Sequence, residues 1–232
     1  NSPGLHAHID PSPATCTSLV VDRVLHHQHG LWAICGAFGD NLLEPALDLA
    51  QSFHLSDKQT EQLRELGELF NYNGYGATMA DLFFHPRDLY EAIRPYANPF
   101  DYLAESQQVN TLRDAYQADI DLAMQQEEQP TKGKNRVYHL PDTSWARRVV
   151  GVFSNRKARE QPAAAHAIIT ENPDGTLRIS VRAPLEDQHR ADALCKLFPT
   201  GGGRAAAAGI NRLPNDMLDK FLRVLVILCT VT

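Results

Sequence analysis

The pattern that most favours a defined chemistry is a run of three glycines, Gly201, Gly202 and Gly203, followed directly by Arg204. Three glycines remove three Cβ atoms and permit positive φ angles, so the run predicts a turn whose backbone N–H groups converge on one anion. Arg204 adds a planar fork of donors suited to phosphate or carboxylate. Arg182, at the end of an expected strand, is placed to reach the same position. A plain loop is the alternative, and the run is not a P-loop, because no Gly-Lys-Ser or Gly-Lys-Thr ends it.

The charge of the chain is unevenly distributed. Residues 1–136 carry 9 Lys and Arg against 19 Asp and Glu, whereas residues 137–232 carry 13 against 9. An acidic part joined to a basic part suits a metal site facing a phosphate site, although two domains of different surface composition give the same asymmetry. The overall net charge of −6 argues against a protein that coats nucleic acid by bulk electrostatics.

The composition is that of a globular protein. Hydrophobic residues make up 43% and charged residues 22%, and 232 residues suffice for one or two domains. The four cysteines are scattered without a Cys-x-x-Cys pair, which favours reduced, buried thiols in a cytoplasmic protein. The longest apolar run, residues 224–229, is far shorter than the ~18 residues of a transmembrane helix, so we expect no membrane partner.

A polar segment containing both proline and glycine, residues 126–136, predicts a linker between two domains. Before the linker, hydrophobic spacing predicts helices over residues 15–25, 56–70, 87–96 and 102–124. The apolar run 31–38 fits either a strand or a buried helix.

The pattern changes after the linker and predicts a sheet with helices. The expected strands cover residues 136–140, 165–170, 176–182 and 205–211, with a hairpin turn at 172–175. The expected helices cover residues 144–159, 187–197 and 215–222. The second half is therefore expected to be a small α+β domain.

Several segments of this second half carry a family resemblance. Ser180-Val181-Arg182, the expected helix 187–197, and residues 198–209 with the glycine run and Arg204 resemble the DHH-associated domain of DHH phosphoesterases. The family pattern there is Ser-x-Arg, Gly-Gly-Gly-His and Ala-Ala-Gly. By this resemblance, Arg182 and the three glycines hold a substrate phosphate or a terminal nucleotide. Arg204 stands where the family usually has His, and a guanidinium does not titrate near neutral pH as imidazole does.

The first half resembles the later part of the DHH catalytic domain. Residues 8–11 and 15–20 are similar to the segment just after the family's Asp-His-His motif, and residues 33–41 are similar to its last metal-binding motif. By this resemblance Asp40 is a catalytic aspartate and a ligand of Mn²⁺ or Mg²⁺, in a two-metal site that activates water for attack at phosphorus. The family's three upstream metal motifs are absent, so the chain resembles an N-terminally incomplete member.

We therefore expect an α/β protein. Residues 1–125 would be the remainder of a parallel-sheet DHH metal domain, and residues 137–232 a DHH-associated substrate-binding domain. The implied activity is metal-dependent hydrolysis of short oligonucleotides or cyclic dinucleotides. Polyphosphate or pyrophosphate hydrolysis is one alternative, and a non-catalytic phosphate- or nucleic-acid-binding module is another. The expected partner is a short single-stranded oligonucleotide, a cyclic dinucleotide or another phosphate ester, and a homodimer is the oligomeric state to be tested.

Overall fold

The fold is described from a computed structural model that covers residues 4, 6–131, 133–187 and 190–229, with side chains as far as residue 226. The chain divides into two units. The first comprises Asn1–Tyr75 and Leu82–Tyr116, and the second comprises Gly76–Asp81 and Gln117–Thr232.

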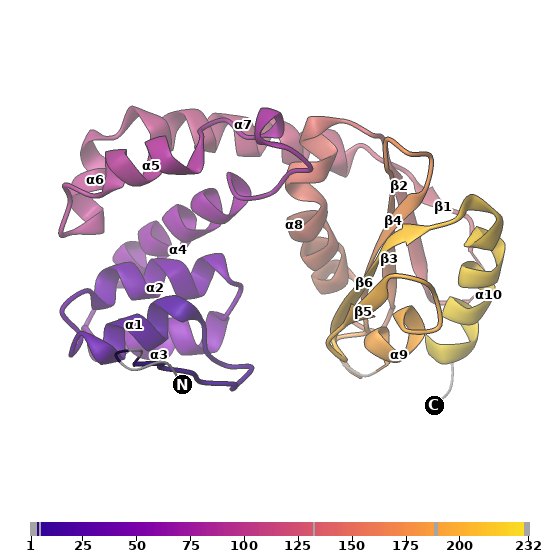
Figure 1. Ribbon diagram of the computed structural model, residues 1–232, viewed down its shortest axis with the longest axis horizontal. Helices are drawn as coiled ribbons and strands as arrows, with labels where there is room; N and C mark the ends of the chain where they lie inside the picture. The colour runs from indigo at the N-terminus through magenta and orange to yellow at the C-terminus, as the bar shows by residue number, and fades with distance from the viewer. Residues whose placement is uncertain (1–3, 5, 132, 188–189, 230–232) are drawn as a thin grey trace. The chain divides into compact units, whose positions relative to one another are not determined.

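The first unit is helical wherever it contains regular structure within the described residues. Its helices are α1 (Thr17–Val24), α2 (Gly30–Gly39), α3 (Leu43–Ser52), α4 (Asp57–Tyr72), α5 (Pro86–Ile93), α6 (Pro99–Glu105) and the first part of α7 (Gln107–Met124). Helix α2 is the most apolar of them and contacts α1, α3 and α4 (Figure 1). It therefore forms the centre of this unit's core.

The apolar run 31–38, which the sequence left open between strand and helix, lies within α2. Glycines let the backbones of α2 and α4 approach closely. A Cβ on Gly67 of α4 would lie 2.1 Å from the carbonyl oxygen of Cys35, and one on Gly39 would lie 2.8 Å from the carbonyl oxygen of Gly67. The small residues of this run therefore serve helix packing.

Side-chain caps set two helix starts in the first unit. Ser56 forms the N-cap of α4, in a capping box with Gln59. The single helix expected over 102–124 is instead two, α6 and α7, because Ser106 is extended between them. The hydroxyl of Ser106 accepts a hydrogen bond from the N–H of Val109 at 3.3 Å, which starts α7.

The second unit is built on a mixed sheet of six strands among the described residues. They are β1 (Glu128–Gln129), β2 (Arg136–Leu140), β3 (His166–Glu171), β4 (Leu177–Arg182), β5 (Gly201–Gly203) and β6 (Ala207–Leu213), in the order β1-β2-β3-β4-β6-β5. Strands β2 and β3 are parallel and the other neighbours are antiparallel. The expected strands over 136–140, 165–170, 176–182 and 205–211 are confirmed as β2, β3, β4 and β6.

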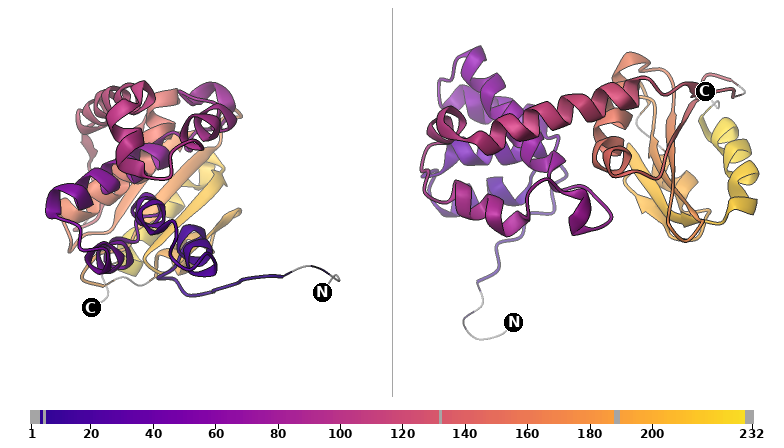
Figure 2. Two further views of the ribbon diagram at one scale, coloured as in Figure 1. Left: turned by 90° about the vertical axis from the view of Figure 1, so that its left-hand side faces the viewer. Right: turned by 90° about the horizontal axis from the view of Figure 1, so that it is seen from above.

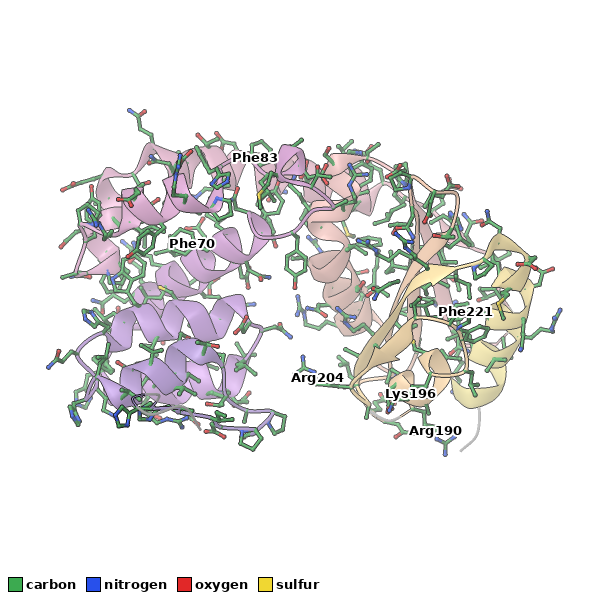
Figure 3. All side chains as sticks on the ribbon, viewed as in Figure 1. Phe70, Phe83, Arg190, Lys196, Arg204 and Phe221 are labelled. Carbon is green, nitrogen blue, oxygen red and sulfur yellow. The ribbon has the colours of Figure 1, made fainter. Side chains whose placement is uncertain are left out.

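Helices cover both faces of this sheet (Figures 1 and 2). Helix α8 (Ser144–Glu160) lies on one face, which we call the α8 face, and α9 (Ala191–Cys195) and α10 (Leu218–Cys229) lie on the other. Phe221 of α10 is buried against Phe198 with their rings 5.7 Å apart (Figure 3). Short 3-10 turns occur at Met79–Asp81 and Asn215–Met217. The chain is thus an α/β protein, as predicted.

No helix within the described ranges is both long enough and apolar enough to cross a membrane.

Candidate functional site

Arg182 lies at the end of β4 and projects from the α8 face. The apolar residues 177, 179 and 181 of β4 belong to the core on the other face, so the alternating residues Arg178, Ser180 and Arg182 point toward the α8 side. The Nε of Arg182 donates to Oδ1 of Asn155 on α8 at 2.7 Å, and a terminal nitrogen donates to Oγ of Ser180 at 3.0 Å. Together with a third bond, from the same terminal nitrogen to the carbonyl oxygen of Val181 at 3.2 Å, these bonds fix the plane of the guanidinium.

The glycine run forms the edge strand β5, so the prediction of a turn with converging N–H groups is wrong. Gly201, Gly202 and Gly203 pair with Ile210, Gly209 and Ala208 of β6, and Gly203 alone of the three has a positive φ. Pairing with β6 fixes the run in an extended conformation, in which successive N–H groups point in opposite directions. The glycines therefore present a flat surface to a ligand rather than a nest of donors.

Arg182 and Arg204 stand in one line across the sheet, which we call the arginine row. Arg182 pairs with Ala207 of β6, and the backbone of Ala207 exchanges two hydrogen bonds with that of Arg204, at 2.8 and 3.1 Å. Residues directly opposite each other project from the same face, so both guanidiniums rise from the α8 face on either side of a small alanine. Arg204 is exposed and extends away from the ribbon (Figure 3).

The next residues on the same face, two positions along the strands from the arginine row, are small. They are Ser180 of β4, Gly209 of β6 and Gly202 of β5, and we call them the glycine row. A Cβ on Gly202 would meet no atom within 4 Å, whereas one on Gly201 would lie 1.8 Å from the carbonyl oxygen of Cys195. Packing therefore requires glycine at 201 but not at 202. A glycine that the fold does not require, in a strand beside two arginines, fits a position where a ligand approaches the backbone.

His166 is a buried residue of this face that the sequence did not single out. It begins β3, opposite Arg182 of β4 and next to Arg136 of β2. Its side chain is almost completely buried, and neither ring nitrogen has a hydrogen-bond partner among the described residues. Burial lowers the pKa of His166 below its ordinary value, and the nearby charge of Arg136 acts in the same direction. The imidazole is therefore neutral beside Arg182 at neutral pH.

His166 should make the stability of the protein sensitive to mild acid. Below the unfolded-state pKa of about 6.5, the unfolded chain takes up a proton that the folded chain does not take up until a lower pH. The free energy of unfolding should therefore fall as the pH falls below 6.5, by up to about 1.4 kcal/mol per pH unit from this group. Urea unfolding at pH 7.5 and 5.5 should show a smaller loss for His166→Leu than for the wild type. Equal losses in the two proteins would contradict this assignment.

Asp40, the expected metal ligand, lies in the first unit at the C-terminal end of α2. It is exposed and borders a small pocket of about 350 Å³ whose other polar side chains are Ser18 and Asn71. The C-terminal end of a helix carries partial negative charge, which disfavours a carboxylate and favours a cation. A cation bound at Asp40 would therefore also be attracted by the C-terminal end of α2.

The described residues do not by themselves fit a two-metal centre. They contain no group of three or more His, Cys, Asp or Glu side chains able to hold a metal ion. One carboxylate supplies too few oxygen ligands for a pair of Mn²⁺ or Mg²⁺ ions. No hydrolytic step is therefore assigned to the side chains described here, and the roles of Asp40, Arg182, the glycines and Arg204 stay predictions.

Comparison with known proteins identifies the fold. No family model and no curated protein matches the chain. Among solved structures, the DHH domain of a member of a ribosomal protein family is similar over 92% of this chain and 52% of its own, with 12% identity and a TM-score of 0.51. A pGpG-specific phosphodiesterase, PggH of Vibrio cholerae, is similar over 80% of this chain and 73% of its own, with 12% identity and a TM-score of 0.51.

The chain spans about half the length of the first of these structures. This structural likeness covers 92% of the chain and so includes residues of both the helical unit and the unit built on the sheet. The protein has the fold of DHH-domain proteins.

Proposed function

We propose that this chain binds a phosphate of a short oligonucleotide or a cyclic dinucleotide on the α8 face of its sheet, as the substrate-binding part of a metal-dependent phosphoesterase. The observation that carries the proposal is the guanidinium of Arg182, held by Asn155 and Ser180 beside a floor of small residues. One of the structures of the same fold is a pGpG-specific phosphodiesterase, which supports a phosphodiester ligand.

The arginine row explains how such a ligand would be held. Two guanidiniums on the same face, about 10 Å apart at the backbone across two strand spacings, can hold one phosphate each or close on one phosphate from two sides. The glycine row beside them leaves room for the sugar and base to lie against the backbone. Arg204 supplies a planar fork of donors that suits phosphate and that a histidine at this position would lack.

Asp40 is our proposed metal ligand, with Mn²⁺ or Mg²⁺ as the ion that would activate water. Polyphosphate or pyrophosphate hydrolysis is the second candidate activity, because either ligand presents phosphates to the arginine row. A cytoplasmic location remains a prediction, and a homodimer remains the oligomeric state to be tested.

Assays of pGpG hydrolysis and of bound metal distinguish an enzyme from a non-catalytic phosphate-binding module. A chain with the complete metal centre of an enzyme would release mononucleotides from pGpG in Mn²⁺ and would hold about two Mn²⁺ ions. Asp40→Asn should abolish this release while leaving the affinity for pGpG unchanged. Binding of pGpG without release or bound metal would instead show a non-catalytic phosphate-binding module.

A further inference from the structure

We propose a second anion-binding position on the α8 face, formed by Arg178, Asn211 and Arg212, which makes the ligand an extended single-stranded oligonucleotide rather than a cyclic dinucleotide. The inference rests on the proposed phosphate binding at Arg182. It assigns a role to residues that neither the motifs nor the arginine row includes.

A β-bulge creates this position. Leu177 of β4 pairs with Leu213 of β6, and Ile179 pairs with Ile210, so the single residue Arg178 faces the two residues 211 and 212. The extra residue breaks the alternation of β6, and both Asn211 and Arg212 are exposed. Bulges redirect side chains and are frequent beside functional sites. We call Arg178, Asn211 and Arg212 the bulge row.

Thr200 holds the bulge in place at a conformational cost. Its hydroxyl accepts from the N–H of Arg212 at 2.8 Å and donates to the carbonyl oxygen of the same residue at 3.3 Å. Its own carbonyl accepts from the N–H of Asn211 at 3.4 Å. Thr200 has a φ of 60°, which is strained for a β-branched residue. The bulge is therefore fixed by contacts that outweigh local backbone strain.

The cations of the bulge row are available to a ligand. Arg178 is exposed, and its side chain makes no hydrogen bond or ion pair with any described residue. Arg212 is 70% exposed, and its nearest carboxylate, Asp174, is 3.6 Å away and already accepts hydrogen bonds from Thr176. Two exposed guanidiniums on one face attract an anionic ligand.

The distance between the two cationic positions fits an extended ligand. Arg178 and Arg182 are four residues apart on β4, or roughly 13 Å at 3.3 Å per residue. The floor between them is uncharged, because it consists of the glycine row. A single strand separates successive phosphates by a sugar that carries an uncharged base, whereas the phosphates of polyphosphate are joined directly. Because α8 packs on β3 and β4, cations at the two ends of a neutral floor fit an oligonucleotide lying along β6 beside this helix.

The test compares 5′-phosphorylated RNA of two and of five nucleotides by fluorescence anisotropy, at several salt concentrations. The wild type should bind the pentanucleotide about tenfold more tightly than the dinucleotide, through the added phosphate contacts. Arg178→Ala should abolish most of this gain and reduce the salt slope for the pentanucleotide by about 0.7, while dinucleotide affinity stays unchanged. Arg223→Ala removes the same charge from α10 on the other face of the sheet and should change neither affinity.

The outcomes also separate this inference from the proposed function. Dinucleotide binding that depends on Arg182, with no gain for the pentanucleotide, would overturn the second position and leave the first intact. A gain that survives Arg178→Ala, or a preference for polyphosphate over the pentanucleotide, would overturn it as well. Failure of both RNAs to bind would remove the proposed function and this inference together.

Discussion

Alanine at position 201 should unfold or strongly destabilise the protein, whereas alanine at position 202 should leave it folded and impair ligand binding. A Cβ at 201 would lie 1.8 Å from the carbonyl oxygen of Cys195, and backbone on both sides must shift to accept it. We expect Gly201→Ala to lower the free energy of unfolding by about 3 kcal/mol, as for severe overpacking. Gly202→Ala adds a methyl group to open space and should change it by less than about 0.5 kcal/mol.

The substitution at 202, which should hardly affect stability, should clearly weaken ligand binding. Because the open space at Gly202 is the floor of the proposed site, Gly202→Ala should weaken pGpG binding by about tenfold. Thermal unfolding of both variants and calorimetric titration of Gly202→Ala with pGpG give the comparison. A Gly202→Ala protein of unchanged affinity would show that no ligand reaches the β5 backbone.

The second large effect concerns a buried ion pair that joins α7 to α8. Arg148 donates from Nε to Asp119 at 2.7 Å, and from a terminal nitrogen to the backbone oxygen of Asp81 at 2.7 Å, with both charged side chains almost completely buried. Arg148→Met should lower the free energy of unfolding by about 3–5 kcal/mol, because it leaves the carboxylate of Asp119 buried without its counter-charge. Denaturant unfolding measures the loss.

A double variant distinguishes the stability lost through the unpaired charge from the stability lost through poorer packing. Arg148→Met with Asp119→Leu removes both charges, so it should be more stable than Arg148→Met alone. If the double variant were as unstable as the single one, packing of the arginine stem rather than the unpaired charge would be responsible. A second ion pair also involves Asp81. The guanidinium of Arg147 lies beside the Asp81 carboxylate and holds its pKa well below the usual range.

Elements with strong local signals were predictable from the sequence. The hairpin at 172–175 is present, with Gly175 at a φ of 78°, because Asn-Pro-Asp-Gly specifies its own turn. The start of α4 follows from the capping box at Ser56 and Gln59. In each case the residues that determine the structure are neighbours in the chain.

The glycine run and the apolar run 31–38 were not predictable in the same way. Glycine fits both a turn and a strand, and pairing with β6 decides between them at Gly201–Gly203. Apolar residues 31–38 fit both a strand and a buried helix, and close packing against Gly67 of α4 decides for the helix. These choices depend on residues far away in the sequence.

The motif residues of the candidate site were found from the sequence, but their supporting residues were not. Asn155 reaches Arg182 only because α8 packs across β4, and His166 lies beside it only through the register of β3 and β4. Arg178 gains its neighbours from a bulge in β6 that no local pattern marks. These contacts are therefore determined by strand register and by the packing of α8, neither of which follows from a local sequence pattern.

Phosphate binding on the α8 face is tested most directly by the affinity of the protein for pGpG with and without the side chain of Arg182. Arg182→Ala should weaken binding by at least about tenfold, because it removes a charge-assisted donor fork, and Arg182→Lys should give an intermediate affinity, because it keeps the charge without the fork. The melting temperature of each variant serves as the folding control. Equal affinities in folded wild-type and Arg182→Ala proteins would contradict phosphate binding on the α8 face.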